Sequence, residues 1–99
     1  MKPYELLYVI SMDKGEEAIA AIIAKVNGAI EALGGKAEGV FQTEPWGRRR
    51  LAYPINHLDE GYYVLTHFSV ESKPLGELER TLKLTEGILR YMVTRRIEG

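Results

Sequence analysis

The sequence predicts an α+β sandwich, in which a four-stranded antiparallel sheet carries two helices on one face. Two observations lead to this prediction. Hydrophobic periods typical of strands and of helices follow one another in the order strand, helix, strand, strand, helix, strand. The 99 residues and the 45% hydrophobic content fit one globular domain spanning residues 1–99.

The first two predicted elements are a strand and a long helix. Tyr4 to Ile10 is rich in β-branched and aromatic residues, and it has apolar residues on both faces, which is typical of a central strand. Asp13 and Glu16 form a helix-start signal. The apolar residues that then recur at helical spacing, as far as the stop at Gly34-Gly35, are Ile19, Ile22, Ile23, Val26, Ile30 and Leu33.

The second predicted strand is interrupted. It runs from Lys36 to Phe41, gives way to a loop at Thr43 to Gly47, and resumes through Arg48 to Tyr53. Because Pro54 has no N–H group to donate to a neighbouring strand, this strand is predicted to lie at an edge of the sheet. Asn56 to Gly61 is predicted as a turn-rich connection.

The last three predicted elements are a strand, a short helix and a strand. Tyr62 to Val70 alternates between two faces, and Ser72-Lys73-Pro74 begins a helix with proline in its first turn. Leu89 to Arg96 forms the closing strand. The element order is that of the ferredoxin-like βαββαβ fold, with the first and third strands central. The sheet face without helices is predicted to show Leu7, Val9, Tyr63, Leu65, Arg90 and Met92.

Composition excludes several classes of protein. There is no cysteine, which rules out disulfides, thiolate catalysis and cysteine-based zinc sites. No apolar run approaches the roughly 20 residues that a membrane-spanning helix needs, and no signal-peptide pattern is present. We therefore expect a soluble cytoplasmic protein.

Charge is unevenly distributed along the chain. The net charge is −1, but residues 1–47 carry 4 basic and 7 acidic residues, whereas residues 48–99 carry 9 basic and 7 acidic ones. Six of the seven arginines fall in Arg48 to Arg50 and Arg90 to Arg96. The planar guanidinium group suits phosphate oxygens, so these two clusters are candidate RNA contacts. The alternative for the first cluster is charge that protects an edge strand from aggregation, although lysine is the usual residue for that purpose. The alternative for the second cluster is a solvated chain end.

The sequence contains no catalytic or metal-binding constellation. His57 and His67 are not spaced with acidic residues as metal ligands would be, and no serine-centred nucleophile motif surrounds either of them. None of the glycines forms a phosphate loop with a lysine. We expect no enzyme activity, no metal and no cofactor.

Four segments resemble one known family. Gly47 to Ile55 reads Gly-Arg-Arg-Arg-Leu-Ala-Tyr-Pro-Ile, and Lys2-Pro3-Tyr4-Glu5, Gly61 to Leu65 and Ile88 to Arg96 follow the same family's pattern in order. The family is that of the sixth protein of the bacterial small (30S) ribosomal subunit, the S-six (S6) family. The resemblance implies a ferredoxin-like fold and binding to the central domain of 16S ribosomal RNA as a pair with ribosomal protein S-eighteen (S18). It implies a place in the cytoplasmic ribosome, with no membrane or DNA partner.

Site residues follow from these two lines of reasoning. The residues expected to bind RNA are Lys2, Tyr4, Arg48, Arg49, Arg50, Arg90, Arg95 and Arg96. The residues expected to face a protein partner are Leu51, Ala52, Tyr53, Tyr63, Leu65 and Met92. One alternative is a single-stranded RNA-binding module of the RRM type, which needs aromatic side chains on the open faces of both central strands. Another is an acylphosphatase-like enzyme, which needs an arginine after the first strand, where Ser11 to Gly15 has none.

Overall fold

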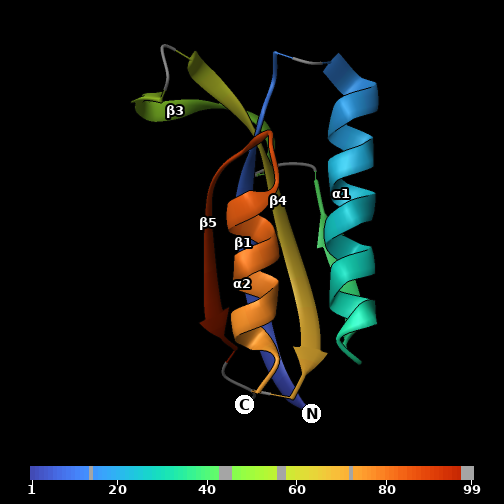
Figure 1. Cartoon of the computed structure of the whole chain (residues 1–99). Helices are drawn as coiled ribbons and strands as arrows, with labels where there is room; N and C mark the ends of the chain where they lie inside the picture. Colours follow the sequence, from blue (N-terminus) through green and yellow to red (C-terminus); the bar gives the residue numbers. More distant parts are fainter. Residues whose placement is uncertain (14, 43–45, 56–57, 72, 97–99) are drawn as a thin grey trace.

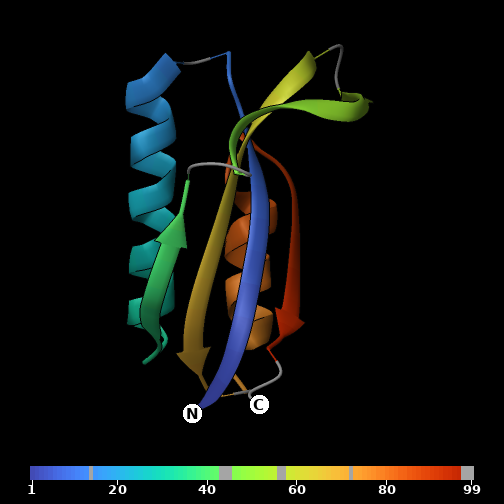
Figure 2. The same ribbon diagram turned by 180° about the vertical axis from the view of Figure 1, so that it is seen from behind.

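The computed structural model describes residues 1–13, 15–42, 46–55, 58–71 and 73–96, without the side chains of residues 52–55 and 58. Its elements are β1 (Lys2–Ser11), α1 (Gly15–Ala32), β2 (Lys36–Phe41), β3 (Gly47–Ile55), β4 (Leu58–Val70), α2 (Leu75–Leu84) and β5 (Ile88–Arg95), as Figure 1 shows. Both helices cover one face of the sheet. Figure 2 shows the other face from behind.

The strand order confirms the predicted ferredoxin-like topology. β1 and β4 are central: β1 pairs antiparallel with β4 and β5, and β4 pairs antiparallel with β2. The predicted second strand consists of two strands in one line. β2 pairs with the end of β4 between Leu65 and Ser69, and β3 pairs with its beginning between Leu58 and Tyr63. The sheet is therefore four positions wide although it contains five strands, and β3 lies at the edge that Pro54 predicted.

The beginning of β4 corrects the sequence analysis. The predicted turn from Asn56 to Gly61 is wrong from Leu58 onward, because β4 starts there and forms a hairpin with β3. Asp59 and Glu60 are polar, and such residues in the sequence indicate a turn more than a strand. Register with β3, in which Arg50 lies opposite Glu60, makes the segment a strand despite its composition.

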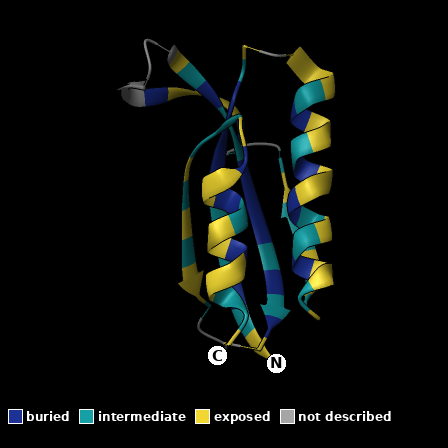
Figure 3. Cartoon of the chain, in the orientation of Figure 1, coloured by how far each residue is buried: buried dark blue, intermediate teal, exposed yellow. Residues whose placement is uncertain are grey.

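The core lies between the sheet and the two helices. The strand alternation expected from the sequence is confirmed, since the inward residues of β1 and β4 are buried (Figure 3). The fully buried side chains are Tyr8, Phe68, Leu6, Ile10, Ile30, Leu78, Leu82, Val26, Val64 and Thr66. Each large apolar side chain buried in this way contributes about 1.5–3 kcal/mol. The core thus fixes which side chains of the sheet point away from the helices.

The open face of the sheet carries the expected residues. Leu7 lies opposite Leu65 on β4 and Met92 on β5, and Val9 lies opposite Tyr63 and Arg90. No described helix covers this face (Figure 2). It is nevertheless partly shielded by its own side chains, because Val9 is only 3% exposed.

Candidate RNA and protein interface

The β3–β4 hairpin presents the three consecutive arginines. Gly47 begins β3 with a φ of 89°, and a Cβ atom there would lie 2.4 Å from the Gln42 carbonyl oxygen. Only glycine fits this entry into the strand. The pairing of β1 with β4 ends at Ser11 opposite Gly61, whereas β4 pairs with β3 back to Leu58. The hairpin therefore projects beyond the end of β1, at the top of Figure 1.

Arg48 is held by a carboxylate across the hairpin. Its Nε donates to Glu60 Oε2 at 2.9 Å, and its Nη2 donates to Glu60 Oε1 at 3.0 Å. The two parallel bonds lower the pKa of Glu60 and raise that of Arg48. This is the bidentate geometry with which an arginine binds a carboxylate or a phosphate.

Arg49 and Arg50 emerge on opposite sides of β3. The Arg49 Cζ lies 5.2 Å from the centroid of the Tyr63 ring, which places Arg49 on the open face. Arg50 lies opposite Glu60 in the register and is exposed. It forms no hydrogen bond or ion pair with the described part of the chain, but its positive charge helps to lower the pKa of Glu60.

The open face contains a shallow hollow of about 410 Å³ beside Arg49. Its lining residues are Leu7, Val9, Tyr63, Arg90, Tyr91 and Met92. Apolar residues dominate the lining, and Met92 is 57% exposed at its edge. Arg90 and Met92 both line the hollow. The sequence analysis had expected Arg90 to contact RNA and Met92 to contact a protein.

The other residues expected to meet a protein partner are less accessible. Leu65 and Leu51 are each only 8% exposed. Leu65 is flanked by Leu7 and Phe41 on the adjacent strands, and Leu51 packs over Gly61. Both leave little surface for a partner to contact.

The structure does not describe the side chains of two residues that were expected to contact a protein partner. Ala52 and Tyr53 lie in β3, but their side chains are outside the described part of the structure. Among the expected protein contacts whose side chains are described, Met92 and half-buried Tyr63 are therefore the accessible ones.

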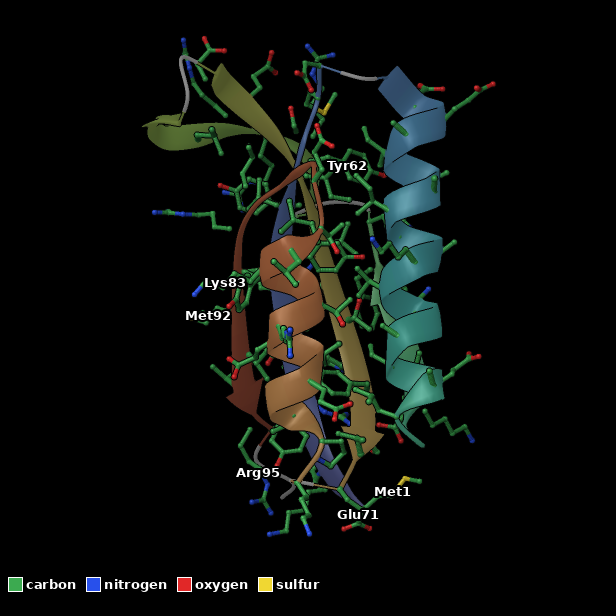
Figure 4. All side chains as sticks on the ribbon, viewed as in Figure 1. Met1, Tyr62, Glu71, Lys83, Met92 and Arg95 are labelled. Carbon is green, nitrogen blue, oxygen red and sulfur yellow. The ribbon has the colours of Figure 1, made fainter. Side chains whose placement is uncertain are left out.

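The remaining basic residues do not join the arginine triplet. Lys2 and Arg95 are exposed near the two marked chain ends, whereas the hairpin lies at the opposite end of the sheet (Figures 1 and 4). In the sheet, Arg95 of β5 is paired with Tyr4 of β1, which is paired in turn with Phe68 of β4. Arg49 of β3 is paired with Gly61 of β4. The seven residue steps of β4 from Gly61 to Phe68 span about 23 Å. The chain therefore has two basic areas, and the sequence analysis did not foresee their separation.

Tyr4 was expected to contact RNA, and the structure corrects this assignment. Its side chain is only 7% exposed and stacks on Phe68 with 5.7 Å between ring centroids, on the helix-covered face. The alternation of β1 places Tyr4 in the core together with Leu6 and Tyr8. Its role is packing.

Arg96 is likewise occupied within the fold. Its Nε donates to the Tyr4 carbonyl oxygen at 3.0 Å, and its Nη2 donates to the Phe68 carbonyl oxygen at 3.3 Å and to Glu38 Oε1. Glu38 also accepts a 2.9 Å hydrogen bond from Ser69. One side chain thus connects the end of β5 with β1, β4 and β2, and few of its donors remain for RNA.

Sequence reasoning missed Glu38 and Glu60, which hold Arg96 and Arg48 in the described part of the structure. Their signal is weak, because Glu60 is 12 residues from Arg48, and Glu38 is 58 residues from Arg96. Glu38 occupies a bulge in β2, between residues paired with Phe68 and His67. Only the register of the sheet brings these charges together.

Two further properties of the described residues bear on function. No group of three or more histidine, aspartate or glutamate side chains in the described segments is arranged to hold a metal ion. Neither of the two described helices is long and apolar enough to cross a bilayer.

Comparisons with known proteins agree on one relationship. A family model described as ribosomal protein S6 matches residues 3–95. Small ribosomal subunit protein bS6 of Clostridium novyi is 45% identical over 93 residues, covering 94% of this chain and 95% of that protein. Its namesake from Thermoanaerobacter pseudethanolicus is 41% identical over 95 residues, covering 96% and 97%. The crystal structure of 30S ribosomal protein S6 from Thermotoga maritima matches with a TM-score of 0.88 at 30% identity, covering 96% of this chain and 87% of that one.

Proposed function

Because the chain belongs to the ribosomal protein S6 family, we propose that it is a structural, non-catalytic constituent of the small ribosomal subunit. In this role it binds the central domain of 16S ribosomal RNA together with ribosomal protein S18. The hairpin supplies the charge for RNA, and the open face supplies an apolar surface for the protein partner. It acts in the cytoplasm as part of the bacterial ribosome.

The observation that carries this proposal is the arrangement of charge around the open face. An apolar hollow lies beside a cationic hairpin, with Arg49 stacked on Tyr63 where the two meet. An apolar sheet surface is suited to a protein partner, and exposed guanidinium groups are suited to phosphate oxygens. Both properties are needed by a protein that joins RNA and another protein.

Sedimentation with the ribosome tests the proposal directly. The tagged chain, expressed in bacterial cells, is expected to co-sediment with small subunits and to be absent from large subunits. Purified chain is then expected to bind a central-domain fragment of 16S ribosomal RNA in the presence of S18. A chain that stays at the top of the gradient and binds no RNA with S18 contradicts the proposal.

A double variant tests the hairpin's part in RNA binding. Arg49→Ala combined with Arg50→Ala removes two cations and is expected to weaken RNA binding while leaving thermal unfolding unchanged. Arg80→Ala is the matched control, because it removes an exposed arginine from α2 on the opposite side of the sheet. If the folded double variant binds RNA like the unmodified chain, the hairpin is not the RNA contact.

The RRM-type alternative is less well supported. Tyr63 is an aromatic residue on the open face of β4, as such a module requires. The described aromatic residues of β1, Tyr4 and Tyr8, both lie in the core, and β1 presents Leu7 and Val9 instead. An oligonucleotide that crosslinks to Tyr63 in the absence of S18 would favour this alternative.

A further inference from the structure

The three consecutive arginines are not equivalent, because strand alternation and local partners separate them. Arg49 lies on the open face with Tyr63, whereas Arg48 and Arg50 lie on the other face of the hairpin with Glu60. A single RNA surface therefore cannot approach all three from one side.

Arg48 already uses its guanidinium edge within the hairpin. The two bonds to Glu60, at 2.9 and 3.0 Å, occupy the Nε and Nη2 edge of the group, and the carboxylate neutralises its charge. A phosphate that meets Arg48 therefore meets a guanidinium group whose charge Glu60 already balances. The same pair neutralises Glu60, so that this carboxylate repels an approaching phosphate less.

Arg49 is engaged in a different way. Its guanidinium group lies 5.2 Å above the Tyr63 ring and beside residues that line the apolar hollow. The contact uses none of its N–H donors, but it holds the group over the open face, which the proposed function assigns to the protein partner. Arg49 thus forms part of the rim of the apolar surface.

Arg50 lies on the face away from Tyr63, and none of its donors is used by the described residues. It is exposed, it forms no hydrogen bond or ion pair with described residues, and it borders a hollow of about 230 Å³ with Asp59 and Glu60. Since Glu60 is paired with Arg48, Asp59 is the remaining negative charge that lines this hollow with Arg50.

We propose that Arg50 is the only arginine of the triplet that contacts an RNA phosphate, whereas Glu60 holds Arg48 and Tyr63 holds Arg49. The proposal rests on the proposed function, because it assumes that the hairpin meets RNA. It replaces a uniform basic patch with one phosphate contact and two supporting residues.

Salt dependence distinguishes the three arginines. Binding of the full chain with S18 to a central-domain fragment of 16S ribosomal RNA is measured across salt concentrations for Arg48→Ala, Arg49→Ala and Arg50→Ala. Each phosphate contact adds about 0.9 to the slope of log affinity against log salt. Arg50→Ala is therefore expected to reduce this slope by about 0.9. Between about 50 and 200 mM salt, the fold-loss of affinity of the variant should then be about 3.5 times smaller than that of the unmodified chain. Arg49→Ala is expected to leave the slope unchanged. Arg48→Ala is also combined with Glu60→Gln, because alone it leaves the Glu60 carboxylate unpaired opposite Arg50, and the double variant is expected to leave the slope unchanged.

Two further variants complete the experiment. Glu60→Gln releases Arg48 and is expected to raise the slope by up to about 0.9. Arg50→Lys retains the charge and is expected to retain the slope of the unmodified chain. Circular dichroism and thermal unfolding check that each variant is folded, and Arg80→Ala again serves as the control for the loss of a distant arginine.

The outcomes separate this proposal from the proposed function. An unmodified chain that binds the RNA, together with an unchanged slope for Arg50→Ala, overturns the assignment of Arg50 alone. Equal reductions in all three single variants overturn it as well, since the triplet then acts as a unit. An unmodified chain that binds no RNA with S18 overturns both the proposed function and this assignment.

Discussion

At the scale of single residues, Gly61 determines how closely the hairpin packs on the sheet. A Cβ atom at this position would lie 2.4 Å from Val9 Cγ1 and 3.1 Å from Leu51 Cδ2. Val9 is β-branched and buried, so its side chain has little freedom to move away. Gly61 therefore allows β1, β3 and β4 to approach one another beneath the open face.

Gly61→Ala is expected to destabilise the protein by about 1–3 kcal/mol, the usual cost of overpacking. Gly28→Ala is the control, because a Cβ atom on this exposed position of α1 meets no atom within 4 Å. Replacing glycine within an exposed helix is expected to stabilise by roughly 0.5–1 kcal/mol. Urea denaturation measures both changes, and a neutral Gly61→Ala would show that the hairpin relaxes without cost.

Met92 tests the open face as a protein-binding surface. It is 57% exposed and lines the hollow, so a charged replacement is tolerated by the fold but not by an apolar partner. Met92→Glu is expected to weaken binding of S18 at least fivefold, which corresponds to about 1 kcal/mol at an interface. Calorimetric titration of S18 with each variant provides the measurement.

Leu84→Glu is the matched control for Met92→Glu. Leu84 is another exposed apolar residue, but it lies at the end of α2 on the helix-covered side. If both substitutions weaken S18 binding equally, the open face is not the specific contact.

At the scale of elements, Arg96 fastens the edges of the sheet to its centre. The short strand β2 pairs with β4 along only one side, and Glu38 in its bulge is bound to Arg96. Through the carbonyl oxygens of Tyr4 and Phe68, the same guanidinium group spans both central strands. The chain after β5 thus contributes to holding β2 in place.

Arg96→Ala is expected to lower the free energy of unfolding by about 1–3 kcal/mol, because it removes hydrogen bonds from a charged donor. Arg95→Ala is the control: Arg95 is exposed, with its Cζ 6.0 Å from the Tyr4 ring centroid, and its loss is expected to cost about 0.5–1 kcal/mol. Amide hydrogen exchange in β2 should accelerate in Arg96→Ala alone. Equal exchange in the two variants would contradict the role assigned to Arg96.

At the scale of the whole molecule, two arginine-bound carboxylates connect stability to pH. Hydrogen bonds from Ser69 and then from Arg96 lower the pKa of Glu38, and hydrogen bonds from Arg48 lower the pKa of Glu60, both from an ordinary 4.5. The unfolded chain regains the ordinary value and therefore binds protons first as the pH falls. The stabilisation is complete above about pH 4.5 and is lost as the pH falls through the lowered pKa values of the folded state.

The free energy of unfolding is therefore expected to decline below about pH 4.5 and to decline less steeply in Glu38→Gln combined with Glu60→Gln. Urea denaturation at a series of pH values from about 6 to 3 measures the two slopes. Identical slopes would show that these carboxylates do not contribute to acid sensitivity.

Much of the fold could be predicted because alternation and helical spacing are local properties of the chain. Tyr62 to Val70 alternates between faces in the sequence, and this pattern survives in β4. The start of β4 at Leu58 could not be predicted, since Asp59 and Glu60 become part of a strand only through pairing with β3. Tyr4 was assigned to RNA because its strand was expected to neighbour the last one with its arginines, but the alternation of β1 turns this side chain into the core.

The sequence by itself determined the order of the elements, the residues that face the core, the edge position of β3 and the resemblance to one family. These depend on periodicity, on the missing N–H group of Pro54 and on short motifs, all of which are local. The tertiary structure alone decided the state of four arginines: Arg48 is bound to Glu60, Arg49 lies over Tyr63, Arg50 has no partner among the described residues, and Arg96 is bound to three strands. The physical reason is that the charge and donors of a guanidinium group are taken up by the carboxylates, carbonyl oxygens and rings beside it, and register and a β-bulge bring those residues from distant parts of the chain.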